Sequence, residues 1–397
     1  MGEAVKDLLL KNEAVYRVTY AIHRLGRRMF MRWVQLRRGV DLNKVTFSSF
    51  RGSNYNDNPR AISERLHELK PDCDIVWLFD SRLVDKIETP DYVRKAAQIS
   101  RAGLIEQATA GFWVDNFVRA ESLYLNPQKQ YYINTWHGDR GFKRVGDDNE
   151  KLRLKKVYRL EDHCAMMIAG SEFGKGTYRT AFHFQGEVLM DGCPRNDVLM
   201  NGDPEKAAAV RKKLGVGEDT RLLLYAPTYR DDHQEKMQSA VLDISRTLDF
   251  LEKTTGEKWK CLYRAHYLNA GLIVREDPRQ LDMSRWQEMS ELLLVSDMLI
   301  TDYSSCGGDF ALQRRPVFLY QPDAREYLEN SRSFYFNPDE SPFLVAHSQE
   351  ELEELIARTD ARAARENCEA LDRFFGTTET GHATDAVCDY IMKRMKR

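Results

Sequence analysis

The chain has 397 residues, which is too many for one ordinary hydrophobic core and predicts two domains. Its 59 Lys and Arg residues nearly balance its 61 Asp and Glu residues, which excludes a globally basic nucleic-acid-binding protein. No apolar run approaches the roughly 20 residues that a membrane-spanning helix requires, and the N-terminus lacks the apolar core of a secretory signal. Seven scattered cysteines without a C-x-x-C pair predict reduced thiols in a cytoplasmic protein.

The most uneven stretch of the sequence lies near its start. Residues 14–40 contain seven arginines and no acidic residue, and apolar side chains recur there at three- and four-residue steps. This pattern predicts an amphipathic helix, whose apolar stripe consists of Val15, Val18, Ile22, Leu25, Met29, Trp33 and Leu36. Such a helix either docks on the protein core or lies on an anionic membrane, and the lack of acidic residues favours the membrane. The expected membrane contacts are Arg24, Arg27, Arg28, Arg32 and Trp33.

Beyond residue 40 the sequence predicts two successive units in which strands alternate with helices, the pattern of βαβ units and parallel sheets. The predicted strands of the first unit are 44–50, 74–79, 111–114 and 130–135. Those of the second unit are 187–190, 221–225, 259–264, 298–301 and 316–320. The fold class is therefore α/β, with two similar halves and a cleft between them.

The turn-rich segment 192–204 is the expected linker between the halves, and the chain is expected to be helical from residue 348 onward. The predicted organisation is an N-terminal amphipathic helix at residues 1–40, a first domain at 41–192 and a second domain at 193–397.

A histidine directly follows one of the predicted strands. His137 lies between Trp136 and Gly138, just after the segment 130–135. In open parallel sheets, ligands bind beyond the carboxyl ends of the strands, and an imidazole placed there can accept a proton near neutral pH. His137 is therefore a candidate base, although a hydrogen-bonded structural histidine would give the same local sequence.

Two further strand ends carry groups suited to an anionic ligand. Arg264 and His266 follow one apolar strand and offer a guanidinium and a second imidazole. Ser304 and Ser305 follow another and precede a predicted helix, so their hydroxyls and the backbone N–H groups of the helix end predict a phosphate-binding site.

A third strand end adds Thr228 and Tyr229 at the same predicted edge. The sequence contains no P-loop, no G-x-G-x-x-G and no G-x-S-x-G, so it lacks the signatures of P-loop proteins, dinucleotide-binding proteins and α/β-hydrolases. No cluster of carboxylates is evident either, so a bound metal or other cofactor is not required.

Six motifs follow one another along the chain: Phe47-Ser-Ser-Phe-Arg-Gly-Ser-Asn-Tyr-Asn-Asp-Asn-Pro59, Thr135-Trp-His-Gly138, Gly192-Cys-Pro-Arg-Asn-Asp197, Tyr225-Ala-Pro-Thr-Tyr-Arg-Asp231, Arg264-Ala-His266 and Ser296-Asp-Met-Leu-Ile-Thr-Asp-Tyr-Ser-Ser305. In this order they resemble the CDP-glycerol glycerophosphotransferases of teichoic acid synthesis. The resemblance implies a GT-B-like fold of two Rossmann-type domains that face a cleft, with CDP-glycerol held mainly by the C-terminal domain. It also implies attachment to the inner membrane face through basic amphipathic helices.

The resemblance extends to single positions. It implies that His137 is the base and that His266 is a second catalytic residue beside Arg264 at the diphosphate. The expected substrate-binding residues are Arg195, Thr228, Tyr229, Arg264, Thr301, Asp302, Ser304 and Ser305.

The chain departs from the family pattern at two places. Trp-His-Gly is usually followed by Thr-Pro-Leu-Lys, whereas this chain has Asp139-Arg-Gly-Phe-Lys143, and Ser341-Pro-Phe343 replaces a Pro-Gly pair. Both departures are expected near the acceptor or the polyol, where they would affect substrate identity.

The implied reaction moves glycerol phosphate from CDP-glycerol to a hydroxyl of an undecaprenyl-diphosphate-linked saccharide, or of a growing polyol-phosphate chain, and releases CMP. A priming, single-addition enzyme is expected, peripheral on the inner face of the bacterial plasma membrane and without nucleic-acid partners. A GT-B glycosyltransferase that uses a nucleotide sugar is the main alternative, and a catalytically inactive partner of a synthesis complex is another. The oligomeric state is open, with a homo-oligomer among the options.

Overall fold

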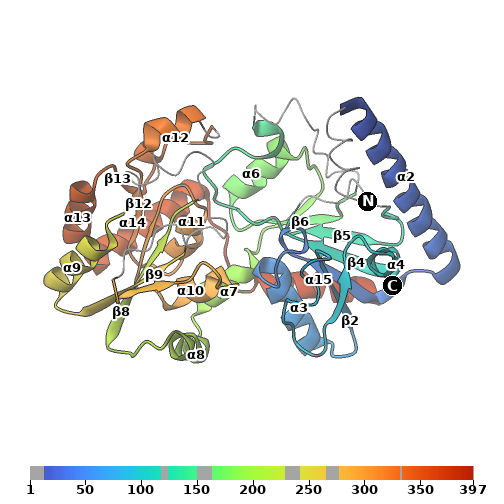
Figure 1. Cartoon of the computed structure of the whole chain (residues 1–397), viewed down its shortest axis with the longest axis horizontal. Helices are drawn as coiled ribbons and strands as arrows, with labels where there is room; N and C mark the ends of the chain where they lie inside the picture. Colours follow the sequence, from blue (N-terminus) through green and yellow to red (C-terminus); the bar gives the residue numbers. More distant parts are fainter. Residues whose placement is uncertain are drawn as a thin grey trace. The chain divides into compact units, whose positions relative to one another are not determined.

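The structure is a computed structural model of the whole chain (Figure 1). It describes residues 13–117, 124–149, 163–228, 242–264, 277–330 and 333–396. By their internal contacts the residues form two compact units. Unit 1 comprises Met1–Trp136, Leu160–Met167 and Val387–Arg397, and unit 2 comprises His137–Arg159 and Ile168–Ala386.

The first described helix, α2 (Glu13–Arg38), has an apolar stripe that faces solvent. Its opposite side buries Met31 and Val34, and the helix packs against α4 (Arg101–Thr109). The exposed stripe consists of Ile22, Leu25, Met29, Trp33 and Leu36, which are 51–79% accessible to solvent. The sequence-based alternative in which this stripe docks on the protein core is therefore wrong. Within the predicted helical region 1–40 the structure describes a helix over Glu13–Arg38, and its role as an amphipathic membrane helix stays a prediction.

The first sheet has seven strands in the order β3-β2-β1-β4-β5-β6-β7, and β1 pairs in parallel with both β2 and β4. Figure 1 labels β2, β4, β5 and β6 of this sheet. In β2 every residue from Ile75 to Phe79 is apolar and buried, as is typical where helices cover both faces of a parallel sheet. The strands are β1 (Asp41–Ser48), β2 (Asp74–Phe79), β3 (Arg94–Ala97), β4 (Ala110–Asp115), β5 (Tyr131–Asn134), β6 (Met166–Ile168) and β7 (Glu187–Leu189).

The second sheet has six parallel strands in the order β10-β9-β8-β11-β12-β13. Because side chains alternate along a strand, Leu222 and Leu224 of β8 join one buried cluster and Leu223 joins the other. The strands are β8 (Thr220–Ala226), β9 (Lys258–Tyr263), β10 (Gln280–Asp282), β11 (Met298–Thr301), β12 (Val317–Tyr320) and β13 (Leu344–Ala346).

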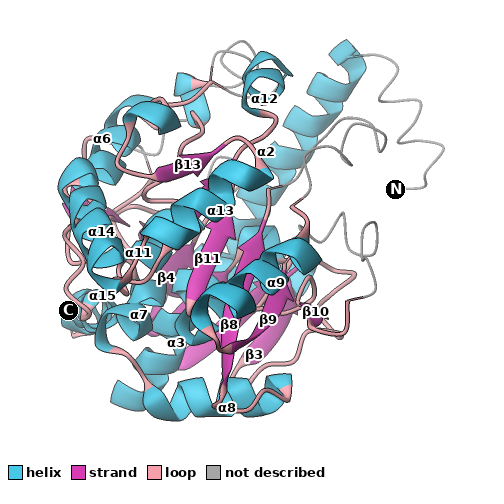
Figure 2. Ribbon diagram, turned by 90° about the vertical axis from the view of Figure 1, so that its left-hand side faces the viewer, coloured by secondary structure: helices cyan, strands magenta, loops and turns pink. Residues whose placement is uncertain are grey.

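Helices flank both faces of the second sheet. The helices α9 (Ile244–Thr255) and α13 (Gln349–Arg358) bury leucines against one face, and Figure 2 shows α9 in front of β8 and β9 and α13 in front of β11. The other face packs against α10 (Met289–Val295) and α14 (Ala361–Phe375). The remaining helices are α3 (Asp57–Leu69), α6 (Glu172–Ala181), α7 (Asp197–Asn201), α8 (Pro204–Leu214), α11 (Cys306–Ala311), α12 (Ala324–Asn330) and α15 (Ala383–Met395).

The structure confirms the α/β fold with two parallel sheets, the strands that the sequence predicts and the helical C-terminal region. The prediction that strand 187–190 belongs to the second sheet is wrong, because β7 lies at the edge of the seven-stranded sheet. The structure adds four short strands, β3, β6, β10 and β13. Strand β3 reads Arg-Lys-Ala-Ala, which has no apolar run to detect. The proposed linker 192–204 contains α7 and a short 3-10 helix, and the domain boundary there stays a prediction.

Candidate active site

The carboxyl ends of β8 and β11 are braced by two residues that the sequence analysis assigned to substrate binding. Thr301 is fully buried, and its hydroxyl donates to the carbonyl oxygen of Ala226 at 2.7 Å. The buried Asp302 carboxylate accepts from the backbone N–H of Thr228 at 2.9 and 3.0 Å and from the Thr228 hydroxyl at 3.1 Å. The side chains of Thr301 and Asp302 therefore shape this edge of the sheet and hold Thr228 in place.

Two serines follow at the turn from β11 into α11. Ser305 is the N-cap residue of α11, and its side chain makes no capping hydrogen bond. The hydroxyl oxygen of Ser304 accepts from the backbone N–H of Cys306 at 3.4 Å. Because α11 spans only six residues, the partly exposed hydroxyl groups, rather than a long helix dipole, are expected to make most of any contact with an anion.

Arg264 lies just beyond β9, on the same edge of the sheet. Its backbone N–H donates to the carbonyl oxygen of Tyr225 at 2.9 Å, and its Nη1 donates to the Sδ of Met289 at 3.3 Å. Burial lowers the pKa of Arg264, and the carboxylate of Glu288 partly offsets this effect. A buried guanidinium is stabilised by an anionic partner, so this position suits a phosphate group. His266 and Tyr229 lie outside the described residues.

The backbone turns sharply just before His137. Trp136 has a φ of 49°, in the left-handed region that bulky residues rarely adopt. Its N–H donates to the side-chain oxygen of Asn134 at 2.8 Å, and its carbonyl oxygen accepts from Nδ2 of Asn58 at 3.3 Å. These contacts hold the turn, and the half-buried His137 follows it directly.

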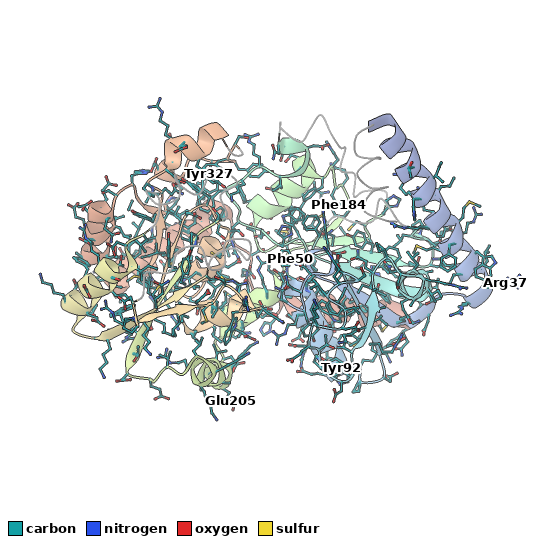
Figure 3. All side chains as sticks on the ribbon, viewed as in Figure 1. Arg37, Phe50, Tyr92, Phe184, Glu205 and Tyr327 are labelled. Carbon is teal, nitrogen blue, oxygen red and sulfur yellow. The ribbon has the colours of Figure 1, made fainter. Side chains whose placement is uncertain are left out.

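A second strained turn follows β1, within the motif that runs from Phe47 to Pro59. Phe50, Arg51 and Asp57 all have positive φ angles, of 45°, 59° and 65° (Phe50 is labelled in Figure 3). The backbone N–H of Phe50 donates to Oδ1 of Asn116 at 2.7 Å. At Gly52 a Cβ atom would lie 2.7 Å from the backbone nitrogen of Asp80, so only glycine fits. The crowding of Asn and Gly in this motif is the sequence signal for such a turn.

Arg195, which the sequence analysis assigned to substrate binding, lies in the protein interior. Its side chain is 8% exposed, and its Nε and Nη2 donate to Oδ2 of Asp309 at 3.3 and 3.0 Å. Its neighbour Asn196 donates from Nδ2 to Oδ1 of Asp309 at 3.0 Å and to Oε1 of Glu379 at 2.8 Å. Asp309 lies on α11, so these contacts are made directly behind the turn formed by Ser304 and Ser305, which we call the serine turn.

Arg140 completes this arrangement, although we expected it near the substrate. It is 1% exposed, and its Nη2 donates to Oδ1 of Asp309 at 3.0 Å and to Oε1 of Glu379 at 2.8 Å. The neighbouring Asp139 is equally buried and accepts from the backbone N–H of Gly170 at 3.1 Å. The departure from the family motif at 139–140 thus lies in the interior. We call the following residues the buried charge cluster: Asp139, Arg140, Arg195, Asn196, Asp309 and Glu379.

The carboxyl groups of the buried charge cluster differ in proton affinity. Burial raises the pKa of Glu379 to about 7, against the attraction of Arg140. Burial also raises the pKa of Asp139. For Asp309 burial acts in the same direction, but Arg195 and Arg140 prevail and hold its pKa below the usual value. With a pKa of about 7, Glu379 changes its protonation near neutral pH.

The residues expected at a membrane all lie on α2. Arg24 and Arg32 are exposed, Arg27 and Arg28 are half-buried, and Trp33 is 51% exposed. Figure 3 labels Arg37 near the C-terminal end of this helix, where its guanidinium lies 6.0 Å from the ring centre of Trp33. Among the residues that the structure describes, no helix is long and apolar enough to cross a membrane.

Comparison with known sequences points to one family. The family described as CDP-Glycerol:Poly(glycerophosphate) glycerophosphotransferase matches residues 29–393. A teichoic acid poly(glycerol phosphate) polymerase of Staphylococcus epidermidis is 30% identical over 371 residues, which are 89% of this chain, and this chain spans 51% of that relative's length. A teichoic acid glycerol-phosphate transferase of Staphylococcus aureus is 28% identical over 370 residues, covering 88% of this chain and 93% of the relative.

Comparison with solved structures agrees with this result. The wall teichoic acid polymerase TagF, in a variant soaked with CDPG, superposes with a TM-score of 0.81 at 27% identity, covering 96% of this chain and 98% of that one. TagF without a named variant or ligand gives a TM-score of 0.79 at 27% identity with the same coverage. The two-sheet, GT-B-like architecture of this chain is thus the architecture of that polymerase.

Proposed function

Because the chain belongs to the CDP-glycerol:poly(glycerophosphate) glycerophosphotransferase family, we propose that it transfers glycerol phosphate from CDP-glycerol to an acceptor hydroxyl and releases CMP. The observation that carries this proposal is the edge of the six-stranded sheet, where a half-buried arginine follows β9 and two serine hydroxyls follow β11, on either side of β8. Arg264 provides the positive charge and Ser304 and Ser305 provide hydrogen-bond donors. This combination suits a diphosphate.

In the proposed reaction the acceptor oxygen attacks the phosphorus that bears glycerol. A new oxygen–phosphorus bond forms, the bond from that phosphorus to the oxygen of CMP breaks, and the acceptor proton passes to His137. Such reactions are catalysed mainly by positioning and by neutralisation of charge, so Arg264 would stabilise the charge on the departing CMP. His266 is proposed as a second catalytic residue and Tyr229 as a substrate-binding residue, although both lie outside the residues that the structure describes. We assign Thr301, Asp302 and Arg195 to the support of this site, on the contacts given above.

The acceptor is proposed to be a lipid-linked saccharide, carried on undecaprenyl diphosphate, at the cytoplasmic face of the plasma membrane. The exposed apolar stripe of α2, flanked by arginines, supports this location because it matches a helix that lies in an anionic membrane surface. A single, priming addition is proposed. A glycosyltransferase that uses a nucleotide sugar shares the fold and remains the alternative.

The test is mass spectrometry of a lipid-linked disaccharide after incubation with CDP-glycerol and the purified protein. We expect the mass of one glycerol phosphate to be added and CMP to appear, whereas a ladder of masses would indicate a polymerase. Competition between CDP-glycerol and UDP-sugars separates the two donor classes. If CDP-glycerol stays intact and a UDP-sugar is consumed, the proposal fails.

The variant His137→Ala tests the base. We expect turnover to fall by about 10²–10⁴-fold, the usual contribution of a general base, while calorimetry shows CDP-glycerol binding close to that of the wild type. His183→Ala is the matched control, because His183 is an exposed histidine of the same unit that pairs with Asp147. A turnover near the wild-type value in His137→Ala would refute this assignment.

A further inference from the structure

Arg140 connects the segment after His137 to the helix after the serine turn. It lies three residues after His137, and through Nη2 it contacts Asp309 of α11 and Glu379 at 3.0 and 2.8 Å. Ser305 is the N-cap of that same helix. One buried guanidinium therefore joins the two segments that carry the proposed base and the proposed phosphate-binding hydroxyls, and all of these residues belong to unit 2.

The space for these side chains is created by glycines. A Cβ atom at Gly308 would lie 2.9 Å from the Cβ of Arg140, and one at Gly174 would lie 1.9 Å from Oδ1 of Asp139. At Gly170 and Gly192 it would lie 2.3 Å from a carboxylate oxygen of Glu379. Contacts this short cannot be accommodated without displacing the buried charges. The sequence thus reserves space for the charged side chains at four separate positions.

The segment is also held on its other side. Phe142 accepts at its carbonyl oxygen from the backbone N–H of Tyr335 at 2.8 Å, and the backbone N–H of Arg144 donates to the carbonyl oxygen of Ser333 at 2.9 Å. Near its middle, a Cβ atom built on Gly141 would lie 3.9 Å from the Cβ of Ser305. The backbone of residues 138–144 is therefore fixed at both ends and runs beside the serine turn.

We propose that Arg140 is a positioning residue, which sets the distance between His137 and the Ser304–Ser305 turn by holding both segments to Asp309 and Glu379. The inference rests on the proposed function, because it requires His137 to be the base. Arg140 touches no reacting atom in this scheme. A displacement of about 1 Å at a reacting group costs about 10²-fold in rate, so loss of Arg140 reduces catalysis more than donor binding.

The decisive variant removes the contact between Arg140 and Glu379 from both sides. Replacing Arg140 alone would leave the buried Glu379 carboxyl group without its guanidinium partner, so Arg140→Gln is combined with Glu379→Gln. The matched control is Arg314→Gln with Asp372→Asn, an ion pair of the same unit that is 24–30% exposed. Cooperative thermal unfolding establishes that each protein is folded.

We expect the double variant to lower kcat about 100-fold, with the KM for CDP-glycerol and the calorimetric Kd within about threefold of the wild type. Only one nitrogen of Arg140, Nη2, donates to Asp309 and Glu379, so a single lysine nitrogen could make the same contacts. The single variant Arg140→Lys, with Glu379 in place, should therefore have a kcat at least tenfold higher than that of the double variant. An unchanged kcat, or a kcat that falls only in step with donor affinity or the folded fraction, overturns the proposal.

Amide hydrogen exchange separates failure of this inference from failure of the proposed function. We expect residues 138–143 to exchange at least tenfold faster in the Arg140→Gln, Glu379→Gln variant and to be unchanged in the control. If the wild type does not transfer glycerol phosphate, the proposed function fails while the exchange result still reports whether Arg140 holds the segment. If exchange is unchanged, the inference fails whatever the activity.

Discussion

The arginines of α2 and those of the buried charge cluster occupy opposite environments. Arg24 and Arg32 are exposed, and among the described residues no carboxylate pairs with them. Arg140 and Arg195 are almost completely buried, and both bind Asp309. An exposed guanidinium stays hydrated, so it is free to meet a charged surface and sensitive to salt. A buried one must be neutralised within the protein, so it fixes the segments that supply its partners.

The largest effect should appear in stability, when a buried partner of arginine is removed and the loss is compared with that at a partly exposed ion pair. Asp309→Asn leaves Arg140 and Arg195 without their shared carboxylate, so we expect the free energy of unfolding to fall by about 3–5 kcal/mol. Asp372→Asn, which breaks the partly exposed pair with Arg314, should lower it by less than about 1 kcal/mol. Urea unfolding of both variants measures the contrast, which equal losses would contradict.

The second difference concerns pH and involves Glu379. This group faces Arg140, Asn196, Asp139 and the backbone N–H of Cys193, and burial raises its pKa to about 7 from an ordinary value of 4.5. Between these two values the folded state binds a proton that the unfolded chain has released. The free energy of unfolding should therefore decrease as pH rises through this window, by about 3 kcal/mol in all, and the contribution is complete below pH 4.5.

Glu379→Gln removes the titrating group and should flatten this part of the pH dependence. The measurement is the difference in unfolding free energy between wild type and variant at pH 5, 6, 7 and 8. A difference that stays constant across this range would show that Glu379 keeps one protonation state.

The smallest effect on stability, and the largest on membrane binding, should come from α2. Arg24→Glu with Arg32→Glu reverses two exposed charges, so we expect binding to vesicles that contain phosphatidylserine to weaken at least tenfold with little change in unfolding. The same reversal at Arg358 and Arg362, which are exposed on α13 and α14, is the control and should leave binding unchanged. Cosedimentation at low and high salt measures both, and equal losses would argue against a membrane role for α2.

Local sequence patterns predicted the parts of the molecule that depend on local physics. Buried parallel strands such as 298–301 begin with a run of apolar residues, and the arginine-rich helix shows its two faces at a regular spacing. The buried charge cluster could not be found this way, because Arg140 and Glu379 are 239 residues apart in the chain. We expected Arg195 to contact a ligand because the residues next to it in the sequence do not reveal that its side chain is buried. The positive φ of Trp136 could not be predicted either, because tryptophan rarely adopts this conformation.

The junction between α2 and β1 limits how freely that helix can move. Only Gly39 and Val40 separate the end of α2 from the first residue of β1, which pairs with strands on both sides. The glycine has a φ of 75°, which turns the chain at once from helix to strand. A connection of two residues restricts rotation of the helix relative to the strand, whereas a long linker would allow the two to rotate independently. A surface that captures α2 would therefore set the angle at which unit 1 presents its sheet, and would do so without any additional anchor.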